Sequence, residues 1–292
     1  MRRIVPVILF MLFCLPALLT AQQAKVAAVP VAGPVFMIQG EGGNIGVIAD
    51  AAGSILIDSM YERSAAQIRA ALKAVPGGEK IRFLIDTHWH GDHTDGNKAF
   101  GPGSIVVAHE NVRALLAAPQ NLMGQKTEAL PAGALPAVTF SDQVTLYAGD
   151  TPVRLVHYSN AHTNGDTVVF VDKFKTIHMG DMFFNGLFPF LDVANGGSID
   201  IWVKQLDAIL ARIPADTKII PGHGPLASPA DLKAFRQMLA DSADVVRRQM
   251  KEGKTLDQVK AAGLPERFAP WTKGFLPTPQ WLELVYSSLA KK

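Results

Sequence analysis

Short apolar runs separated by Gly-, Pro- and Asn-rich turns dominate much of this chain. Between residues 31 and 58 the runs are broken at Gly42-Gly43-Asn44 and Ala51-Ala52-Gly53, which predicts an antiparallel sheet at the start. Later apolar runs also predict strands, most of them followed by polar or Gly-containing turns. These runs are residues 81–85, 105–108, 153–158, 176–179 and 218–220.

Helical spacing of apolar residues appears between and after these strands. Residues 61–75 show it and stop at Pro76-Gly77-Gly78, and residues 110–117 form a second predicted helix. A third helix is expected over 200–213 with Ser198 as its cap, and a fourth from Ser228-Pro229 to about residue 251. Residues 119–136 contain Gly and Pro among small and polar residues, which predicts a surface loop. The mixture predicts an α/β protein with one domain.

The amino-terminal segment has the pattern of a secretory signal peptide. A basic start at Arg2-Arg3 precedes an apolar run over residues 4–19, and small residues follow at Thr20 and Ala21. The alternative is a membrane anchor, but the run is shorter than the usual span of about 20 residues and contains two prolines. We therefore expect residues 1–21 to be removed, a periplasmic location and no stable membrane anchor. The domain would be residues 22–292, with a helical C-terminal extension from about residue 229.

Charge and cysteine content exclude several classes of protein. The chain has 28 basic and 26 acidic residues, and loss of the leader with its two arginines leaves 26 of each. A neutral chain has no electrostatic footprint for nucleic acid, so we expect a small-molecule substrate. The one cysteine, Cys14, lies in the leader, so zinc ligation by a thiolate is excluded after cleavage. Nothing in the chain indicates an oligomeric state.

The most informative local pattern is Thr87-His88-Trp89-His90-Gly91-Asp92-His93, directly after the apolar run over 81–85. In extended backbone His88 and His90 point to the same side, so both can bind one ion. Asp92 and His93 lie past the strand, where the turning backbone can direct them to a second ion. Crowded imidazoles repel each other once protonated, so the cluster gains nothing without a partner such as a metal.

Four donors do not complete two coordination spheres, and three other strand ends offer more. The predicted strand at 153–158 leads into a polar loop carrying His162. The strand at 176–179 ends in Gly180-Asp181, and the strand at 218–220 ends in Pro221-Gly222-His223-Gly224. Loops at the ends of rigid strands are common positions for ligands.

The ordered set of His88 to His93, His162, Asp181 and His223 resembles that of the metallo-β-lactamase superfamily, over about residues 31–230. The resemblance implies an αββα sandwich of two mixed β-sheets with outer helices and a metal site along one edge. It also implies two Zn²⁺ per chain, with iron or manganese as alternative metals. His88, His90 and His162 would hold the first ion, and Asp92, His93 and His223 the second, with Asp181 bridging them.

A dinuclear zinc site of this kind predicts a hydrolase. Bound zinc lowers the pKa of water from about 15.7 to about 7, so a metal-held hydroxide could attack an acyl carbonyl, with Asp92 orienting it. The superfamily's cysteine-containing β-lactamase subclasses carry their thiol where this chain has Asp181. The subclass with an Asp-His pair matches Asp92 and His93 but generally lacks the bridging carboxylate. The seven-residue set is closer to glyoxalase II and lactonases.

Several functions remain open on this reasoning. We rank hydrolysis of a β-lactam or lactone first, because the predicted signal peptide would place the enzyme outside the cytoplasm, where the target of β-lactams lies. A glyoxalase II-like thioesterase fits the ligand set, although that task is usually intracellular and the C-terminal region lacks a convincing basic cluster for glutathione. A mononuclear-iron oxidoreductase like the persulfide dioxygenases would need only part of the ligand set. A non-catalytic metal-binding protein would show no acyl hydrolysis even when loaded with metal.

The segment after Asp181 is rich in aromatic residues and has two interpretations. Phe183, Phe184, Phe188 and Phe190 either line an apolar pocket over the metals or pack into the core. Asn160 and Asn164 flank His162, and we expect them to stabilise a turn. The remaining histidines, for which we expect packing or surface roles, are His109, His157 and His178.

Overall fold

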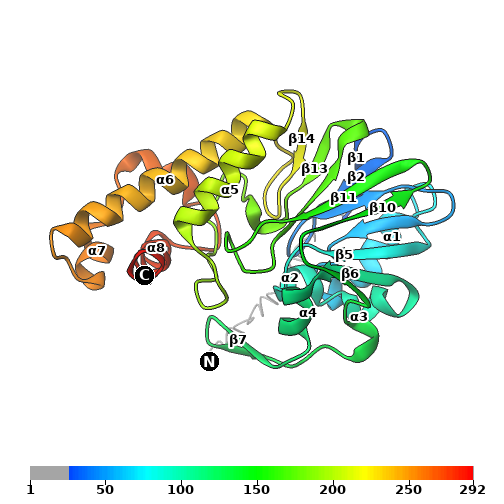
Figure 1. The fold of residues 1–292 in the computed structure, drawn as a ribbon, viewed down its shortest axis with the longest axis horizontal. Helices are drawn as coiled ribbons and strands as arrows, with labels where there is room; N and C mark the ends of the chain where they lie inside the picture. The colour runs from blue at the N-terminus through cyan, green and yellow to red at the C-terminus, as the bar shows by residue number, and fades with distance from the viewer. Residues whose placement is uncertain (1–25, 292) are drawn as a thin grey trace, which may run out of the picture.

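The computed structural model describes residues 26–291 and shows two β-sheets packed face to face between layers of helices (Figure 1). This is the expected αββα sandwich. The predicted leader at residues 1–21 lies outside the described residues. Among residues 26–291, no helix has the length and hydropathy needed to cross a membrane.

The first sheet has seven strands in the order β1-β2-β3-β4-β5-β6-β9. Strands β1 to β4 pair antiparallel as predicted, whereas β4, β5, β6 and β9 pair parallel, so the sheet is mixed. The bounds are β1 Ala28–Ala32, β2 Val35–Ile38, β3 Ile45–Ile48, β4 Ser54–Ile57, β5 Ile81–Asp86, β6 Ile105–His109 and β9 Val138–Phe140.

The second sheet has five strands in the order β10-β11-β12-β13-β14. The first four pair antiparallel, and β13 pairs parallel with β14. Their bounds are β10 Gln143–Ala148, β11 Thr151–His157, β12 Thr167–Val171, β13 Thr176–His178 and β14 Lys218–Ile220. The strand predicted at 218–220 is confirmed without any shift, and those predicted at 153–158 and 176–179 are confirmed with boundary shifts of one or two residues.

Alternating side chains let each sheet contribute to two hydrophobic layers. In β5, Leu84 packs under the helix α1 (Ala65–Leu72), while the next residue, Ile85, faces the opposite sheet. In β12, Val168 faces the helices of the second sheet and Val169 faces the first sheet. Both faces of these central strands are buried, which explains their nearly continuous apolar sequences.

Helices cover the outer face of each sheet (Figure 1). The first sheet is accompanied by α1 Ala65–Leu72, α2 Gly91–Thr94, α3 Asn97–Phe100 and α4 Glu110–Leu116. The second sheet is covered by α5 Ile199–Arg212, α6 Pro229–Lys251 and α8 Thr278–Ala290, with α7 Leu256–Ala262 packed on α8. Ser198 caps α5 through its side chain as predicted, and Ser228 forms a capping box with Asp231 at the start of α6.

The segment 119–136 differs from the simple loop that its composition predicts. It contains a two-stranded hairpin, β7 Gln120–Leu122 and β8 Gln125–Thr127, which turns at Met123-Gly124 with positive φ at both residues. Positive φ at both turn residues suits the tight hairpins that match strand twist. The hairpin is mostly exposed, which agrees with the expected surface position, and its two short strands are the part that the expectation of a loop did not include.

Candidate metal centre

The seven predicted donor residues lie together at one edge of the sandwich. His88 and His90 follow β5, and Asp92 and His93 lie in the short helix α2. The second sheet supplies the other three from the loops after β11, β13 and β14, namely His162, Asp181 and His223. The structure therefore brings all seven together, and both sheets contribute to the site.

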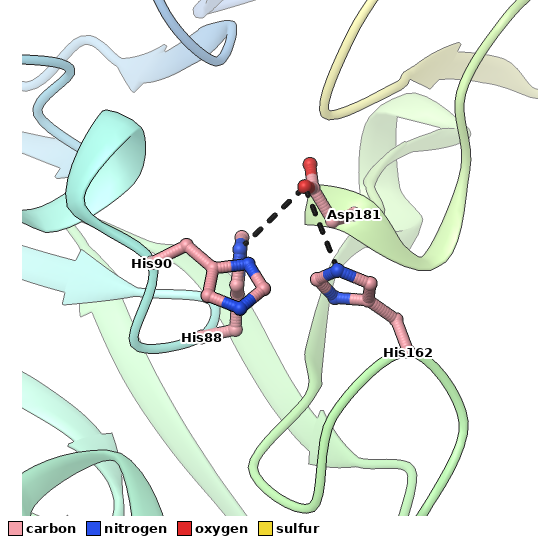
Figure 2. A group of neighbouring side chains, drawn as sticks. All are labelled: His88, His90, His162 and Asp181. Atoms are coloured by element: carbon pink, nitrogen blue, oxygen red, sulfur yellow. Dashed lines mark ion pairs between the residues drawn. The ribbon is translucent and has the colours of Figure 1, made fainter. Parts of the chain in front are cut away.

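The first group of donors is buried. His88, His90, His162 and Asp181 are all buried, and their donor atoms lie within 4.8 Å of one another. The three imidazoles are mutually edge-on, with ring centroids 4.7 to 4.9 Å apart. Figure 2 shows the Asp181 carboxylate over these rings. Such a cage of three imidazoles matches a zinc site that keeps one position open.

The second group consists of Asp92, His93 and His223, with donor atoms again within 4.8 Å of one another. His223 Nε2 lies 3.1 Å from Asp92 Oδ2 and 3.4 Å from His93 Nε2. Asp92 and His223 are half-buried, so this group faces the solvent more than the first.

Asp181 lies between the two groups and presents one carboxylate oxygen to each. Its Oδ1 is 3.0 Å from His93 Nε2 and 3.4 Å from His223 Nε2. Its Oδ2 is 3.6 Å from His88 Nε2 and 3.8 Å from His162 Nε2 (Figure 2). This is the position required of a carboxylate that bridges two ions.

Three aspartates that were not predicted from the sequence contact the imidazoles of three donors. Each lies at the ring nitrogen that faces away from the centre. His93 Nδ1 donates to Asp58 Oδ2 at 2.7 Å, and His90 Nε2 donates to Asp192 Oδ2 at 3.1 Å. His162 Nδ1 lies 3.4 Å from Asp166 Oδ1. Each contact leaves the other ring nitrogen as the one available to a metal. Carboxylates in this role fix the tautomer and orientation of the imidazole.

Thr87 fixes the fourth imidazole through the same carboxylate that holds His93. The hydroxyl of Thr87 donates to Asp58 Oδ2 at 2.8 Å, so its oxygen is left to accept from His88 Nδ1 at 3.1 Å. The His88 Nε2 lone pair then points into the centre. Burial, followed by the field of His93, moves the pKa of His88 well below its ordinary value, so this ring is neutral and ready to bind a cation.

The second group carries protons when no metal is bound. Burial lowers the pKa of His223, but Asp181 and Asp92 outweigh it and raise the pKa to about 9. Burial also lowers the pKa of His93, and the same two carboxylates move it well above its ordinary value. Because a metal binds only neutral imidazole, an ion entering here would displace these protons.

The carboxylates of Asp92 and Asp181 stay ionised because protonated histidines lie beside them. Burial raises the pKa of Asp92, but His93 and a hydrogen bond from His223 bring it down to about 2. Burial also raises the pKa of Asp181, but His93 and His223 move it well below its ordinary value. Two fixed negative charges therefore remain at the centre at neutral pH.

Close backbone approach at two glycines makes room for the site. A Cβ at Gly222 would lie 2.0 Å from Asp181 Oδ1, and one at Gly43 would lie 2.1 Å from the His93 ring. Neither glycine has positive φ, so what excludes a side chain there is space. The Gly222 amide also donates to the Gly180 carbonyl at 2.7 Å, which holds the loops of Asp181 and His223 together.

The aromatic segment after Asp181 divides between the core and the cavity. Phe183, Phe184 and Phe188 are fully buried, so the core interpretation holds for these three. Phe184 also stacks on the His223 ring, with centroids 4.9 Å apart. Phe190 is half-buried and lines the cavity over the centre, so the pocket interpretation holds for this one.

The other residues considered in the sequence have structural roles. Asn160 adopts positive φ and donates to the Gly196 carbonyl, and the Asn164 carbonyl accepts from Asn111. His109 and His157 stack on each other with centroids 3.6 Å apart. His178 is buried and lies 3.1 Å from the Asn44 carbonyl. The structure places none of these five in either described donor group.

A cavity of about 420 Å³ opens over the centre. Its floor includes His90, Asp92, Asp181 and His223. The rim combines the ion pair of Arg63 and Glu41 with apolar and aromatic side chains, namely Tyr61, Leu122, Met123, Phe190 and Phe275. This size is typical of a small-molecule site.

The donor set fits a pair of metal ions. His88 Nε2 and His162 Nε2 are buried without a hydrogen-bond partner among the described residues. Leaving such atoms unpaired costs free energy, which a bound cation would recover. Five imidazoles and two carboxylates suit borderline divalent cations, and their division into two groups suggests a dinuclear metal site.

Known proteins share the fold and the region that carries the donors. The chain matches a metallo-β-lactamase type 2 of Bacteroides fragilis with 23% identity over 145 residues, covering 50% of this chain and 54% of that protein. The chain thus spans about half the length of this curated relative. A double mutant of the sec-alkyl sulfatase PisA1 has a similar structure with a TM-score of 0.70 and 17% identity, covering 90% of this chain and 50% of the sulfatase. A metallo-β-lactamase from Pontibacter korlensis gives a TM-score of 0.58 and 19% identity, covering 74% and 99% of the two chains.

A family model matches the part of the sequence that contains all seven donor residues. The model of the metallo-β-lactamase superfamily matches residues 38–223, which begins in β2 and ends at the last of the seven donor residues. The chain therefore belongs to the metallo-β-lactamase superfamily.

Proposed function

We propose that this protein is a hydrolase that holds two zinc ions and cleaves an acyl bond of a small molecule, with a β-lactam or lactone as the favoured substrate. The position of Asp181 carries the proposal, because one oxygen faces each donor group and a carboxylate in that place serves two ions at once. Zinc at this site would supply Lewis acidity and a water ionised near neutral pH.

The residues of the chain divide the remaining work. His88, His90 and His162 form a rigid buried cage whose orientation is fixed from outside, so the reacting groups meet in one geometry. Asp92 faces the cavity and stays ionised, so it can accept a hydrogen bond from the attacking water and orient it. The cavity above is large enough for a bicyclic lactam or a substituted lactone.

The leader-like pattern of residues 1–21 favours this choice of substrate. We propose that residues 1–21 direct the protein to the periplasm and are removed there. A lactam-cleaving enzyme protects a target that lies outside the cytoplasm, and the cysteine-free mature chain is indifferent to an oxidising compartment.

Metal analysis combined with a substrate panel tests the proposal. The panel contains nitrocefin, a lactone, a glutathione thioester and a phosphodiester. We expect about two zinc ions per chain and turnover of the lactam or lactone. Full activity with a single ion, or turnover of the phosphodiester alone, would refute the proposal.

Two variants and a control make the test specific. His90→Ala and Asp181→Asn should each lose metal and turnover, because each removes a donor. Asp216→Asn changes an exposed aspartate that pairs with Lys175, so it should keep both. Metal content and rates are measured together, and wild-type values in the first two variants would contradict the assignment.

A further inference from the structure

A second cavity of about 420 Å³ lies directly beside the one over the metal centre. The tip of the β7–β8 hairpin, the loop over residues 190–194 and the helix α8 form its walls. Leu122, Met123 and Phe190 line both cavities, so these side chains lie between the two.

The second cavity lies close to one donor of the first group, His90, through Phe190 and Asp192. The Phe190 ring lies 5.5 Å from the His90 ring, and Asp192, which accepts from His90 Nε2, also lines the second cavity. A molecule with one end at the metals therefore needs only to pass Phe190 to place its other end here.

Most side chains that line the second cavity are apolar, and its uncharged polar members are Asn121, Gln280 and Ser287. The Asp192 carboxylate also lines it, but this group already accepts from Trp89 and His90. Val193, Leu276 and Leu284 contribute to the far wall. Glu283 also lines it, but its carboxylate is paired with Lys260 Nζ at 2.6 Å. A wall of this composition favours a flexible alkyl chain over a charged or strongly polar group.

Two large apolar side chains are exposed around the same opening. Met123 is 60% exposed and Phe275 is 59% exposed, and both line the cavity over the metals. Apolar surface of this kind, gathered at the mouth of a cavity, is typical of a binding site.

We propose that the second cavity binds a linear alkyl chain of the substrate, with α8 as one wall and Phe190 beside the bend of the chain. The identity of the scissile bond rests on the proposed function, whereas binding of the chain does not. For an alkyl-substituted γ-lactone, hydrolysis adds one water, breaks the acyl C–O bond and yields a hydroxy carboxylate and a proton. The helix α8 lies outside the family match, so this wall belongs to the C-terminal part of the chain.

Binding and turnover are measured separately as a function of the length of the ligand's alkyl chain. Calorimetry with the zinc-loaded protein follows butanoate, hexanoate, octanoate and decanoate, and kinetics follow γ-lactones with matching alkyl chains. Burial of each methylene should strengthen binding about fourfold, so decanoate, which has six more methylenes than butanoate, should bind about a thousandfold tighter or more. Equal affinities across the series would overturn the proposal.

Variants at the second cavity test whether the alkyl chain of the ligand binds there. Ala194 is exposed and lines this cavity, so Ala194→Trp fills it, while Ala208→Trp makes the same change on an exposed position of α5. Ala194→Trp should weaken decanoate binding about tenfold or more and leave butanoate unchanged, and Ala208→Trp should alter neither. Equal effects of Ala194→Trp on both ligands would overturn the assignment.

A second variant covers the case in which Ala194→Trp does not fold. Leu284→Ala removes part of the wall and should reduce the preference for decanoate several-fold. An unchanged preference would contradict the proposal. If chain-length-dependent binding is found but neither a lactone nor a lactam is cleaved, the proposed function fails and the alkyl site stands. If lactones are cleaved but neither binding nor turnover depends on the length of the alkyl chain, the alkyl site is refuted and the proposed function stands.

Discussion

At the scale of single residues, Asp58 supports both donor groups from outside the donor set. It is fully buried, accepts from His93 Nδ1 and accepts from the Thr87 hydroxyl that orients His88. One carboxylate thus aligns an imidazole in each donor group. Loss of a carboxylate in this position typically lowers metal affinity 10- to 100-fold.

Asp58→Asn should therefore weaken zinc binding by about 10- to 100-fold. Asp58 adopts positive φ, which Asn tolerates well, so the backbone should not change. Competition with a chromophoric chelator measures the affinity. Asp172→Asn, at an exposed partner of Arg154, is the control, and equal affinities in the two variants would contradict the role of Asp58.

A second prediction at this scale concerns Gly222. Gly222→Ala would place a methyl group against Asp181 Oδ1 and the Gly180 carbonyl, so the bridging carboxylate must move and metal should be lost. Gly91 lies next to Asp92, and a Cβ there meets nothing within 4 Å among the described residues. Gly91→Ala should keep its metal. Metal content measured on both variants tests the pair, and retention of two ions in Gly222→Ala would show that the loop can yield.

At the scale of elements, the sequence predicted the donors better than the residues that support them. Each donor is of a metal-binding type and follows an apolar run, so local pattern sufficed. Asp58 also directly follows a strand, but its role depends on contact with His93, 35 positions away along the chain. Asp192 lies in an aromatic segment, and only the fold brings it to His90. Contacts between distant segments leave no local pattern to read.

The β7–β8 hairpin was missed for a different reason. Its strands are three residues long and largely exposed, so neither alternation nor a buried run marks them. By contrast, α6 was predicted from its first residue to its last because Ser228-Pro229 is a strong start signal and the apolar spacing continues to the end.

The start of α6 yields a prediction about stability. The Ser228 side chain accepts from the Asp231 amide, and the Asp231 carboxylate accepts from the Ser228 amide at 2.8 Å. Ser228→Ala should lower the free energy of unfolding by about 1 kcal/mol. Metal content should not change, because the cap touches none of the donors. Urea denaturation with metal analysis checks both, and loss of metal would show that the cap also supports the His223 loop.

At the scale of the whole molecule, stability of the metal-free protein should depend on pH through the second donor group. The pKa of His223 is raised from 6.5 to about 9, so its contribution is complete below pH 6.5 and is lost as the pH rises through 9. The pKa of Asp92 is lowered from 3.8 to about 2, so its contribution is present above pH 3.8 and is lost as the pH falls toward 2.

Burial holds the pKa of His88 well below 6.5, so its contribution is present above pH 6.5 and is lost as the pH falls below that value. Thermal unfolding of chelator-treated protein should accordingly give its highest Tm near about pH 6.5, with lower values on either side. Zinc-loaded protein should not lose stability between pH 6.5 and 9, because the metal replaces the proton on His223. Parallel alkaline losses with and without zinc would contradict this account.

The family match ends at His223, yet α8 forms part of a cavity beside the metals. Bond cleavage and one wall of the proposed alkyl site are thus encoded in successive stretches of the gene. Mutations or recombination downstream of residue 223 can alter which molecules are accepted while all seven donors stay intact. Under the proposed function, substrate range in this protein can diverge in evolution faster than its chemistry.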